Sequence, residues 1–186
     1  MRKLVVTEYI TLDGVMEAPN KWSFQFWSEE AAQFKFDELF ASDALLLGRV
    51  TYEGFAAAWP SMKDDAGFAD RMNSIPKYVV STTLQTATWN NSTLIKENVA
   101  AEVASLKQQP GMDILVAGSS DLVHTLIQHN LIDEYRFMLH PVIVGSGKRL
   151  FREESAMTTL KPIATKTFSS GIVILSYEPV ATANAQ

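Results

Sequence analysis

The sequence contains no cysteine, and this absence excludes several kinds of site at once. A disulfide framework, a thiolate zinc centre, an iron–sulfur cluster and a cysteine nucleophile all require that side chain. A chain without cysteine fits a reducing compartment, and we expect a cytoplasmic protein. The histidines His124, His129 and His140 have no carboxylate partners at metal-ligand spacing, so no metal site is predicted.

Long apolar runs and clusters of basic residues are also missing. No stretch approaches the ~18 apolar residues that span a bilayer, and Thr7 and Glu8 interrupt the apolar start, so we expect no signal peptide. Sixteen Lys and Arg against 21 Asp and Glu give a net charge of −5, with no basic block to follow a nucleic-acid backbone. The sequence therefore predicts neither a membrane nor a nucleic-acid partner.

What is present is an ordinary globular composition, with 47% hydrophobic and 20% charged residues in a chain of 186. The length fits one domain, which we place at residues 1–178. The small, polar segment 179–186 is expected to be a frayed tail.

Short apolar runs that end in turn residues predict the strands, and helical patterns lie between most of them. Strands are expected near 4–11, 44–47, 78–80, 93–95, 114–117, 134–139, 160–168 and 172–177. Helices are expected near 28–41, 51–59, 97–107 and 121–129, the second of them with Thr51 as its N-cap. This order predicts one α/β domain with a mixed, mainly parallel sheet, helices on both faces and a C-terminal antiparallel hairpin.

Two of the predicted strands end in the same way. Gly48 and Arg49 follow one apolar run, Gly118 and Ser119 follow another, and each pair leads into a helix. Ligands collect beyond the carboxyl ends of such strands, and a helix start offers unpaired N–H groups to anions. The two ends are therefore either ordinary helix entries or a site for the two phosphates of a dinucleotide. Residues 81–83, after a third strand, could with Arg49 hold a further phosphate.

The segment 15–28 is unusually aromatic for a connection between a strand and a helix, with Trp22, Phe26 and Trp27 among its residues. Two interpretations remain open. The segment either packs onto the core, or forms one wall of a pocket for a flat ring, since loops commonly carry sites.

Several motifs, taken in order, resemble those of the dihydrofolate reductases. The resemblance covers residues 3–177 and is closest to the reductase half of the bifunctional deaminase-reductase of riboflavin synthesis. The segments that carry it are Leu12-Asp13-Gly14, Gly48-Arg49-Val50-Thr51-Tyr52-Glu53, Val80-Ser81-Thr82, Ile95-Lys96, Val116-Ala117-Gly118-Ser119-Ser120, Leu131-Ile132-Asp133-Glu134-Tyr135 and His140-Pro141-Val142-Ile143-Val144-Gly145-Ser146-Gly147.

The resemblance implies an eight-stranded sheet, NADPH as the cofactor and a set of residues that bind it. By this resemblance, the phosphate bridge and the 2′-phosphate region would be bound by Gly48, Arg49 and Thr51. The adenosine side would be lined by Ser81 and Thr82, with Lys96 nearby. The pyrophosphate and nicotinamide ribose would be bound by Gly118, Ser119, Ser120, Asp121 and Leu122. Ser119 stands where the family has the second glycine of a pair, and its backbone conformation decides whether this part of the site is kept.

The resemblance also implies a carboxylate at the start of the first helix, four residues before a phenylalanine. Glu30 and Phe34 have that spacing, although an acid in a first turn also compensates the helix dipole. Asp13 is the second candidate for a catalytic carboxylate, and its other interpretation is an Asp-Gly turn. The substrate pocket would be formed by Trp22, Phe26, Trp27 and Phe34.

The function implied is NADPH-dependent hydride transfer to a small, flat nitrogen heterocycle, either pyrimidine-like or pterin-like. The alternative is a nucleotide-binding homodimeric module that keeps the fold without turnover. By analogy with other sheets of this kind, a homodimer would pair through the C-terminal strands and the loop from Pro141 to Arg152.

Overall fold

The computed structural model describes residues 1–151 and 157–180. The strands of this part are β1 (Leu4–Thr11), β2 (Ser42–Gly48), β3 (Lys77–Val80), β4 (Ser92–Ile95), β5 (Asp113–Val116), β6 (Glu134–His140), β7 (Leu160–Thr167) and β8 (Val173–Pro179). The α-helices are α1 (Glu29–Phe40), α2 (Arg49–Ala58), α3 (Phe68–Ser74), α4 (Val99–Gln108) and α5 (Ser120–Gln128). Short 3-10 turns occupy Pro19–Lys21, Phe24–Phe26 and Trp59–Ser61.

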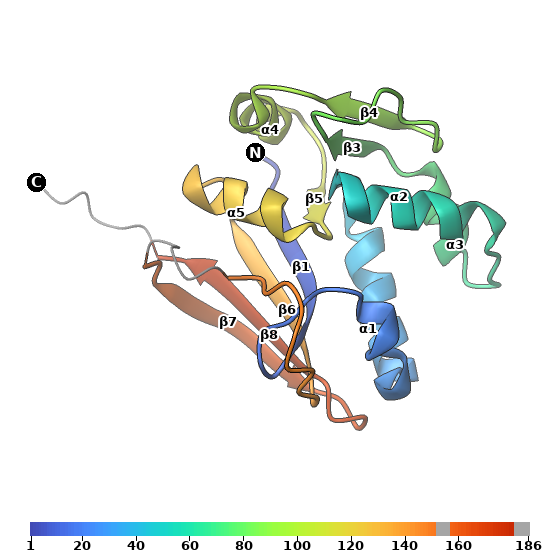
Figure 1. Ribbon diagram of the computed structural model, residues 1–186, viewed down its shortest axis with the longest axis vertical. Coiled ribbons are helices and arrows are strands. Elements are labelled where there is room, and N and C mark those ends of the chain that lie inside the picture. The colour runs from blue at the N-terminus through green and yellow to red at the C-terminus, as the bar shows by residue number, and fades with distance from the viewer. Residues whose placement is uncertain (152–156, 181–186) are drawn as a thin grey trace, which may run out of the picture.

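All eight strands belong to one sheet, in the order β4-β3-β2-β5-β1-β6-β8-β7. Neighbours from β4 to β6 run parallel, whereas β8 is antiparallel to both β6 and β7. The predicted mixed, mainly parallel sheet with a C-terminal hairpin is therefore confirmed (Figure 1). Strand β1 pairs with β5 from Leu4 to Val6 and with β6 from Val5 to Thr11. Strands β1 and β5 therefore separate midway along β1.

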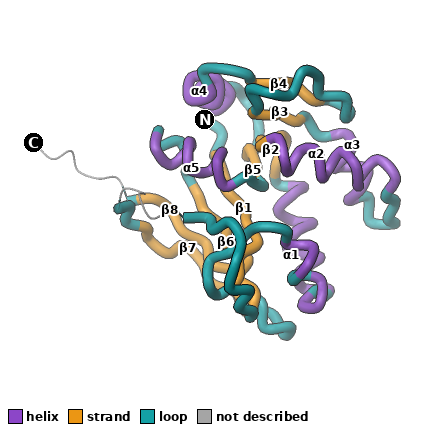
Figure 2. Tube along the Cα trace, viewed as in Figure 1, coloured by secondary structure: helices purple, strands orange, loops and turns teal. Residues whose placement is uncertain are grey.

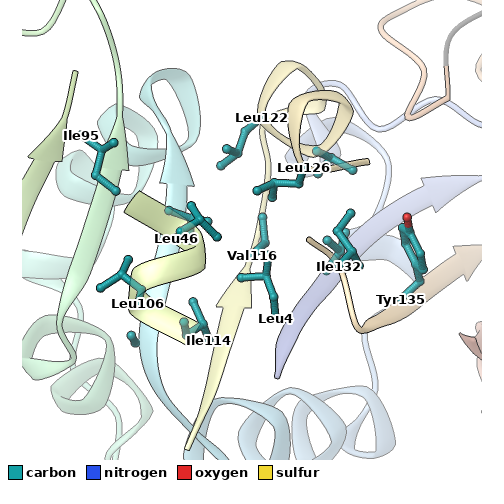
Figure 3. Packing of buried hydrophobic residues seen from close by; sticks show 14 of the residues in the cluster. Leu4, Leu46, Ile95, Leu106, Ile114, Val116, Leu122, Leu126, Ile132 and Tyr135 are labelled. Carbon is teal, nitrogen blue, oxygen red and sulfur yellow. The ribbon is translucent and has the colours of Figure 1, made fainter. Parts of the chain in front are cut away.

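The helices cover both faces of the sheet, as the burial pattern requires (Figure 2). Leu4 and Val6 point into a cluster with α4 and α5, and Val5 points into a cluster with α1, α2 and α3. This alternation follows from the period of two along a strand. Strands β2 and β5 are apolar without alternation because helices cover both of their faces. Figure 3 shows Leu46 and Val116 of these strands packed between Leu106 of α4 and Leu126 of α5.

Helix α2 begins at Arg49, so the prediction of Thr51 as its N-cap is wrong. Gly48 is the N-cap, with extended backbone (φ −75°, ψ 159°) and no side chain to cap the helix. The reason is a contact between strand ends. The Gly48 N–H donates to the Gly118 carbonyl (2.9 Å), which leaves the next residue to start the helix directly.

The C-terminal strand β8 reaches Pro179, and the Val180 N–H donates to the Thr159 carbonyl (2.9 Å). Residues 181–186 of the predicted tail lie outside the described residues. Within residues 1–151 and 157–180, no helix combines the length and apolar character that a membrane span requires.

Candidate functional site

A cavity of about 310 Å³ lies where β2, β3 and β5 end and α2 and α5 begin. Because these strands run parallel, their carboxyl ends meet at one edge of the sheet. The structure therefore brings together residues that are far apart in the chain, such as Gly48 and Leu122, which are 74 positions apart. Of the predicted cofactor-binding residues, those that line this cavity are Gly48, Arg49, Ser81, Thr82, Ser119, Asp121 and Leu122.

The ends of β2 and β5 touch at Gly48. A Cβ on this glycine would lie 2.9 Å from the Ser119 backbone nitrogen and would also collide with the Ser119 hydroxyl. The requirement for glycine here is one of space, since its φ of −75° suits any residue. A bare backbone at this point lets main-chain amides line the cavity wall.

The glycine–serine pair before α5 is compatible with this role. Gly118 has φ +91°, which favours glycine, and a Cβ there would lie 2.7 Å from Thr51 Oγ1. Ser119 has φ −87° and ψ 171°, ordinary extended backbone, so a serine fits where the resembling family has a second glycine. The Ser119 hydroxyl caps α5 by accepting a hydrogen bond from the Leu122 N–H. Thr51 and Gly118 thus lie against each other just outside the cavity lining.

The charges around the cavity favour an anion on balance. The α2 N-terminus lacks a side-chain cap, so its first N–H groups and the positive end of its dipole face the cavity. The Arg49 guanidinium is exposed and bonds Glu53 at 2.9 Å, an i,i+4 pair of the weak surface type. Asp121 is negative but forms an ion pair with Lys148 at 3.7 Å.

The third strand end contributes hydroxyl groups of unequal availability. The Ser81 Oγ accepts hydrogen bonds from the Leu84 N–H (2.9 Å) and the Thr83 N–H (3.2 Å), so it mainly holds its own turn. Thr82 is exposed at the cavity wall. Lys96 follows β4, the strand beside β3, and is exposed but outside the lining. Ser120 is buried and also lies outside the lining.

The two predicted catalytic carboxylates both hold loops. Asp13 accepts hydrogen bonds from the Thr11 hydroxyl (2.6 Å), the Gly145 N–H (2.8 Å) and the Val144 N–H (3.3 Å). These bonds, that of Thr11 foremost, lower the pKa of Asp13 to about 2. This geometry favours the turn interpretation, because such a carboxylate keeps its charge and has no proton to donate at neutral pH.

Glu30 is held in a comparable way. Its Oε2 accepts hydrogen bonds from the Ser169 hydroxyl (2.6 Å) and the Ser169 N–H (2.8 Å), which lower its pKa. Ser169 lies in the turn between β7 and β8, so Glu30 ties the start of α1 to that hairpin. Its role toward a substrate stays a prediction.

Much of the aromatic segment packs onto the core. The Trp22 ring is 6% exposed, meets the His140 ring edge-on at 5.1 Å, and donates its Nε1–H to the Glu17 carbonyl (3.0 Å). Phe26 lies 6.0 Å from the same histidine ring, and Phe34 lies 6.1 Å from the Phe168 ring. Of the four predicted pocket residues, Trp27 is the exposed one, with 44% of its surface open, and Phe24 of the same segment is 69% exposed. None of these four residues lines the 310 Å³ cavity.

One buried acid escaped the sequence analysis. Glu8 on β1 is 5% exposed, and burial raises its pKa to about 8, although Lys35 and the Gly118 amide both act to lower it. Its Oε1 has no hydrogen-bond partner within the described part of the chain. The signal was present in the sequence as a single acid within a strand that is otherwise buried.

A second buried group of charges lies between α1 and the sheet. Glu38 accepts a hydrogen bond from the Thr7 hydroxyl (3.0 Å) and pairs with Lys35, and Arg136 of β6 lies 3.6 Å from its other oxygen. Both hydrogen bonds go to Oε2, and Glu38 Oε1 has no hydrogen-bond partner among the described residues, but Lys35 and Arg136 balance the charge of Glu38 and tie the helix to the sheet. Within residues 1–151 and 157–180, no three His, Asp or Glu side chains converge as metal ligands would.

Comparison with known proteins agrees with this architecture. The family model of the RibD C-terminal domain matches residues 2–174. The uncharacterized protein YyaP of Bacillus subtilis (strain 168) is 34% identical over 180 residues, which cover 95% of this chain and 94% of that protein.

Two solved structures share the fold at low sequence identity. A putative riboflavin biosynthesis protein from Shewanella sp. PV-4 superposes with a TM-score of 0.78 at 19% identity, over 96% of this chain and 99% of that one. The dihydrofolate reductase from Enterococcus faecalis, complexed with NADP(H), superposes with a TM-score of 0.63 at 15% identity, over 95% of this chain and 96% of that one. The predicted resemblance is confirmed, and the protein belongs to the RibD C-terminal domain family, with a dihydrofolate reductase-like fold.

Proposed function

We propose that the protein is an NADPH-dependent reductase that transfers a hydride to a small, flat nitrogen heterocycle of pyrimidine or pterin type. The observation that carries the proposal is the cavity where β2, β3 and β5 end. Main-chain amides, a guanidinium group and hydroxyls from segments far apart in sequence converge there. Such a set suits a ligand with several phosphates, and the family and fold are those of reductases.

The residues fit the anionic part of a dinucleotide. The space that a Cβ would fill at Gly48 is taken by Ser119, so the two strand ends pack backbone against backbone where they border the cavity. The uncapped start of α2 and the start of α5 would hold the pyrophosphate, and Arg49 would pair with a 2′-phosphate. When bound, NADPH would supply the hydride. The protein would orient it and exclude water.

The titration of NADPH fluorescence tests the cofactor assignment. We expect saturable binding by the wild-type protein and weaker binding by Arg49→Met, because a charge-assisted contact to phosphate is lost. Lys161→Met removes the same charge on β7, at the far edge of the sheet, and should bind like wild type. Glu53→Gln frees the Arg49 guanidinium from its intrahelical pair and should not weaken binding. Absence of NADPH binding at millimolar concentration would remove the proposal.

Turnover is a separate question from binding. Oxidation of NADPH should be followed with dihydropterin, pyrimidine and flavin acceptors, and steady consumption with one of the first two supports the reductase. Binding without turnover on any acceptor would leave the nucleotide-binding module instead.

We further propose that the protein assembles as a homodimer. A homodimer through the C-terminal strands and the 141–152 loop predicts twice the chain mass in light scattering, and a monomer mass would contradict it. Arg152, at the end of that loop, lies outside the described residues.

A further inference from the structure

The carboxyl of Glu8 lies at the point where the two central strands separate. Glu8 pairs in register with Phe137 of β6, but β5 has already ended beside Val6. The connection after β1 runs through α1 toward β2, and the connection after β5 runs through α5 toward β6, so the chain leaves this point in opposite directions across the sheet. In open α/β sheets, that position is where ligands bind.

The surroundings of Glu8 join it to the cavity. The alternation along β1 places it on the same face as Leu4 and Val6, which α5 covers. The Gly118 amide is directed at its carboxyl. The next residue, Ser119, lines the cavity, and consecutive Cα atoms are only ~3.8 Å apart. The Glu8 carboxyl therefore lies next to Gly118, the residue that precedes the cavity-lining Ser119.

The remaining neighbours leave one oxygen of Glu8 unused. On the cavity side, the Cβ position of Gly118 is 2.7 Å from Thr51 Oγ1 and 3.8 Å from the Met16 methyl group. The charges that act on Glu8 are Lys35 and Glu38, both from α1, and neither forms a hydrogen bond with it among the described residues. Met16 is the flexible side chain beside Gly118, and Glu8 Oε1 has no hydrogen-bond partner among the described residues.

Glu8 differs from the other candidate acids in its protonation state. The carboxylates of Asp13 and Glu30 are exposed and accept hydrogen bonds that lower their pKa. Burial raises the pKa of Glu8 to about 8, so near neutral pH it is mostly a carboxylic acid with an O–H to donate. A neutral acid of this kind pairs well with an amide, whose carbonyl accepts from its O–H and whose N–H donates to its other oxygen.

We propose that the buried Glu8 carboxyl, with its unpartnered Oε1, is the hydrogen-bond partner of the carboxamide on the nicotinamide ring when the cofactor occupies the cavity. The inference rests on the proposed function, because it needs the pyrophosphate of NADPH at the starts of α2 and α5. In this assignment, Glu8 binds the nicotinamide end of the cofactor and makes no contact with its phosphates. The pH dependence of binding separates the two parts.

The test compares NADPH with 2′,5′-ADP, which keeps the adenosine and its phosphates but has no nicotinamide. Affinities are measured at pH 7 and pH 9 by calorimetry for the wild type, Glu8→Gln and Glu29→Gln. Glutamine keeps a neutral, hydrogen-bonding side chain at every pH. Glu29 is an exposed acid at the start of α1, so its substitution controls for the removal of one negative charge.

For the wild type and Glu29→Gln, the affinity for NADPH should fall about tenfold from pH 7 to pH 9, because the neutral fraction of a group with a pKa of about 8 falls by that factor. The affinity of Glu8→Gln for NADPH should show no such fall. The affinity for 2′,5′-ADP should be the same in all three proteins at each pH, and this also shows that Glu8→Gln is folded.

Three results would overturn the inference. If NADPH affinity changes equally with pH in the wild type and Glu8→Gln, Glu8 does not contact the ring. If the fall occurs equally with 2′,5′-ADP, its origin lies in the phosphate contacts. If 2′,5′-ADP binds, and the affinity for NADPH is the same in all three proteins and at both pH values, the cavity binds the cofactor without a contribution from Glu8. Failure of both ligands to bind overturns the proposed function together with this inference.

Discussion

The close approach of two strand ends at Gly48 makes a quantitative prediction. In Gly48→Ala the new methyl group would lie 2.9 Å from the Ser119 backbone nitrogen, and a backbone atom cannot rotate away as a side chain can. The end of β2 must therefore move from the start of α5, which strains the hydrogen bond from Gly48 to the Gly118 carbonyl. Overpacking of this kind costs ~1–3 kcal/mol.

The chain offers a matched control in the next helix. Gly54 lies within α2, is exposed, and has no atom within 4 Å of its Cβ position. Gly54→Ala is the same chemical change without the collision. It should stabilise the protein by ~0.5–1 kcal/mol, because alanine loses less backbone entropy than glycine in a helix.

In urea unfolding followed by far-UV circular dichroism, the free energy of unfolding should be lower for Gly48→Ala and higher for Gly54→Ala than for the wild type. For a chain of this size, 1 kcal/mol corresponds to ~2–4 °C, so Gly48→Ala should melt roughly 2–12 °C below wild type and Gly54→Ala roughly 1–4 °C above it. Gly48→Ala should also bind NADPH more weakly. A Gly48→Ala protein as stable as wild type would refute the close approach of the two strand ends.

Three further substitutions probe other buried or paired groups. Tyr52→Phe removes the hydroxyl that accepts the Trp89 backbone N–H (2.9 Å), and chemical denaturation should show a loss of ~1–3 kcal/mol because that N–H is left buried and unpaired. The lowered pKa of Asp13 contributes stability that is present above about pH 4 and is lost as the pH falls through about 2. Asp13→Asn should therefore melt at a lower temperature than the wild type at pH 7, and this difference should disappear in melting curves recorded near pH 2. The raised pKa of Glu8 has the opposite sign, so wild-type stability should fall as pH rises from 4.5 to about 8, a fall that melting curves of Glu8→Gln should lack.

The sheet was predictable because its signals are local. Continuous apolar runs such as Leu45-Leu46-Leu47 become strands covered on both faces, and each ends in residues that open a turn or helix. The N-cap of α2 was misplaced by three residues because Thr51 has the side chain of an N-cap, whereas the bond from Gly48 to Gly118 joins residues 70 positions apart. No local pattern encodes such a bond.

The site was predictable to a lesser extent. Parallel strand order is enough to bring Gly48, Ser81 and Ser119 to one edge, and the structure places all three on the cavity. The carboxylates were harder, because their partners are remote: Asp13 bonds Gly145, and Glu30 bonds Ser169. Glu8 was visible as a lone acid in an apolar strand, but its place beyond the end of β5 and its missing hydrogen-bond partner depend on segments that its own strand does not reveal.

The outer strand β7 has a consequence for how copies of the protein can meet. Seven of its eight residues are exposed, Lys161 and Lys166 stand on it, and its pairing with β8 shifts register after Pro162. Proline without an N–H, repeated positive charge and an interrupted ladder all discourage a foreign strand from extending the sheet. At this edge, two molecules would therefore associate through their side-chain surfaces rather than by backbone pairing of β7 with a second β7, which disfavours fibre growth through this strand.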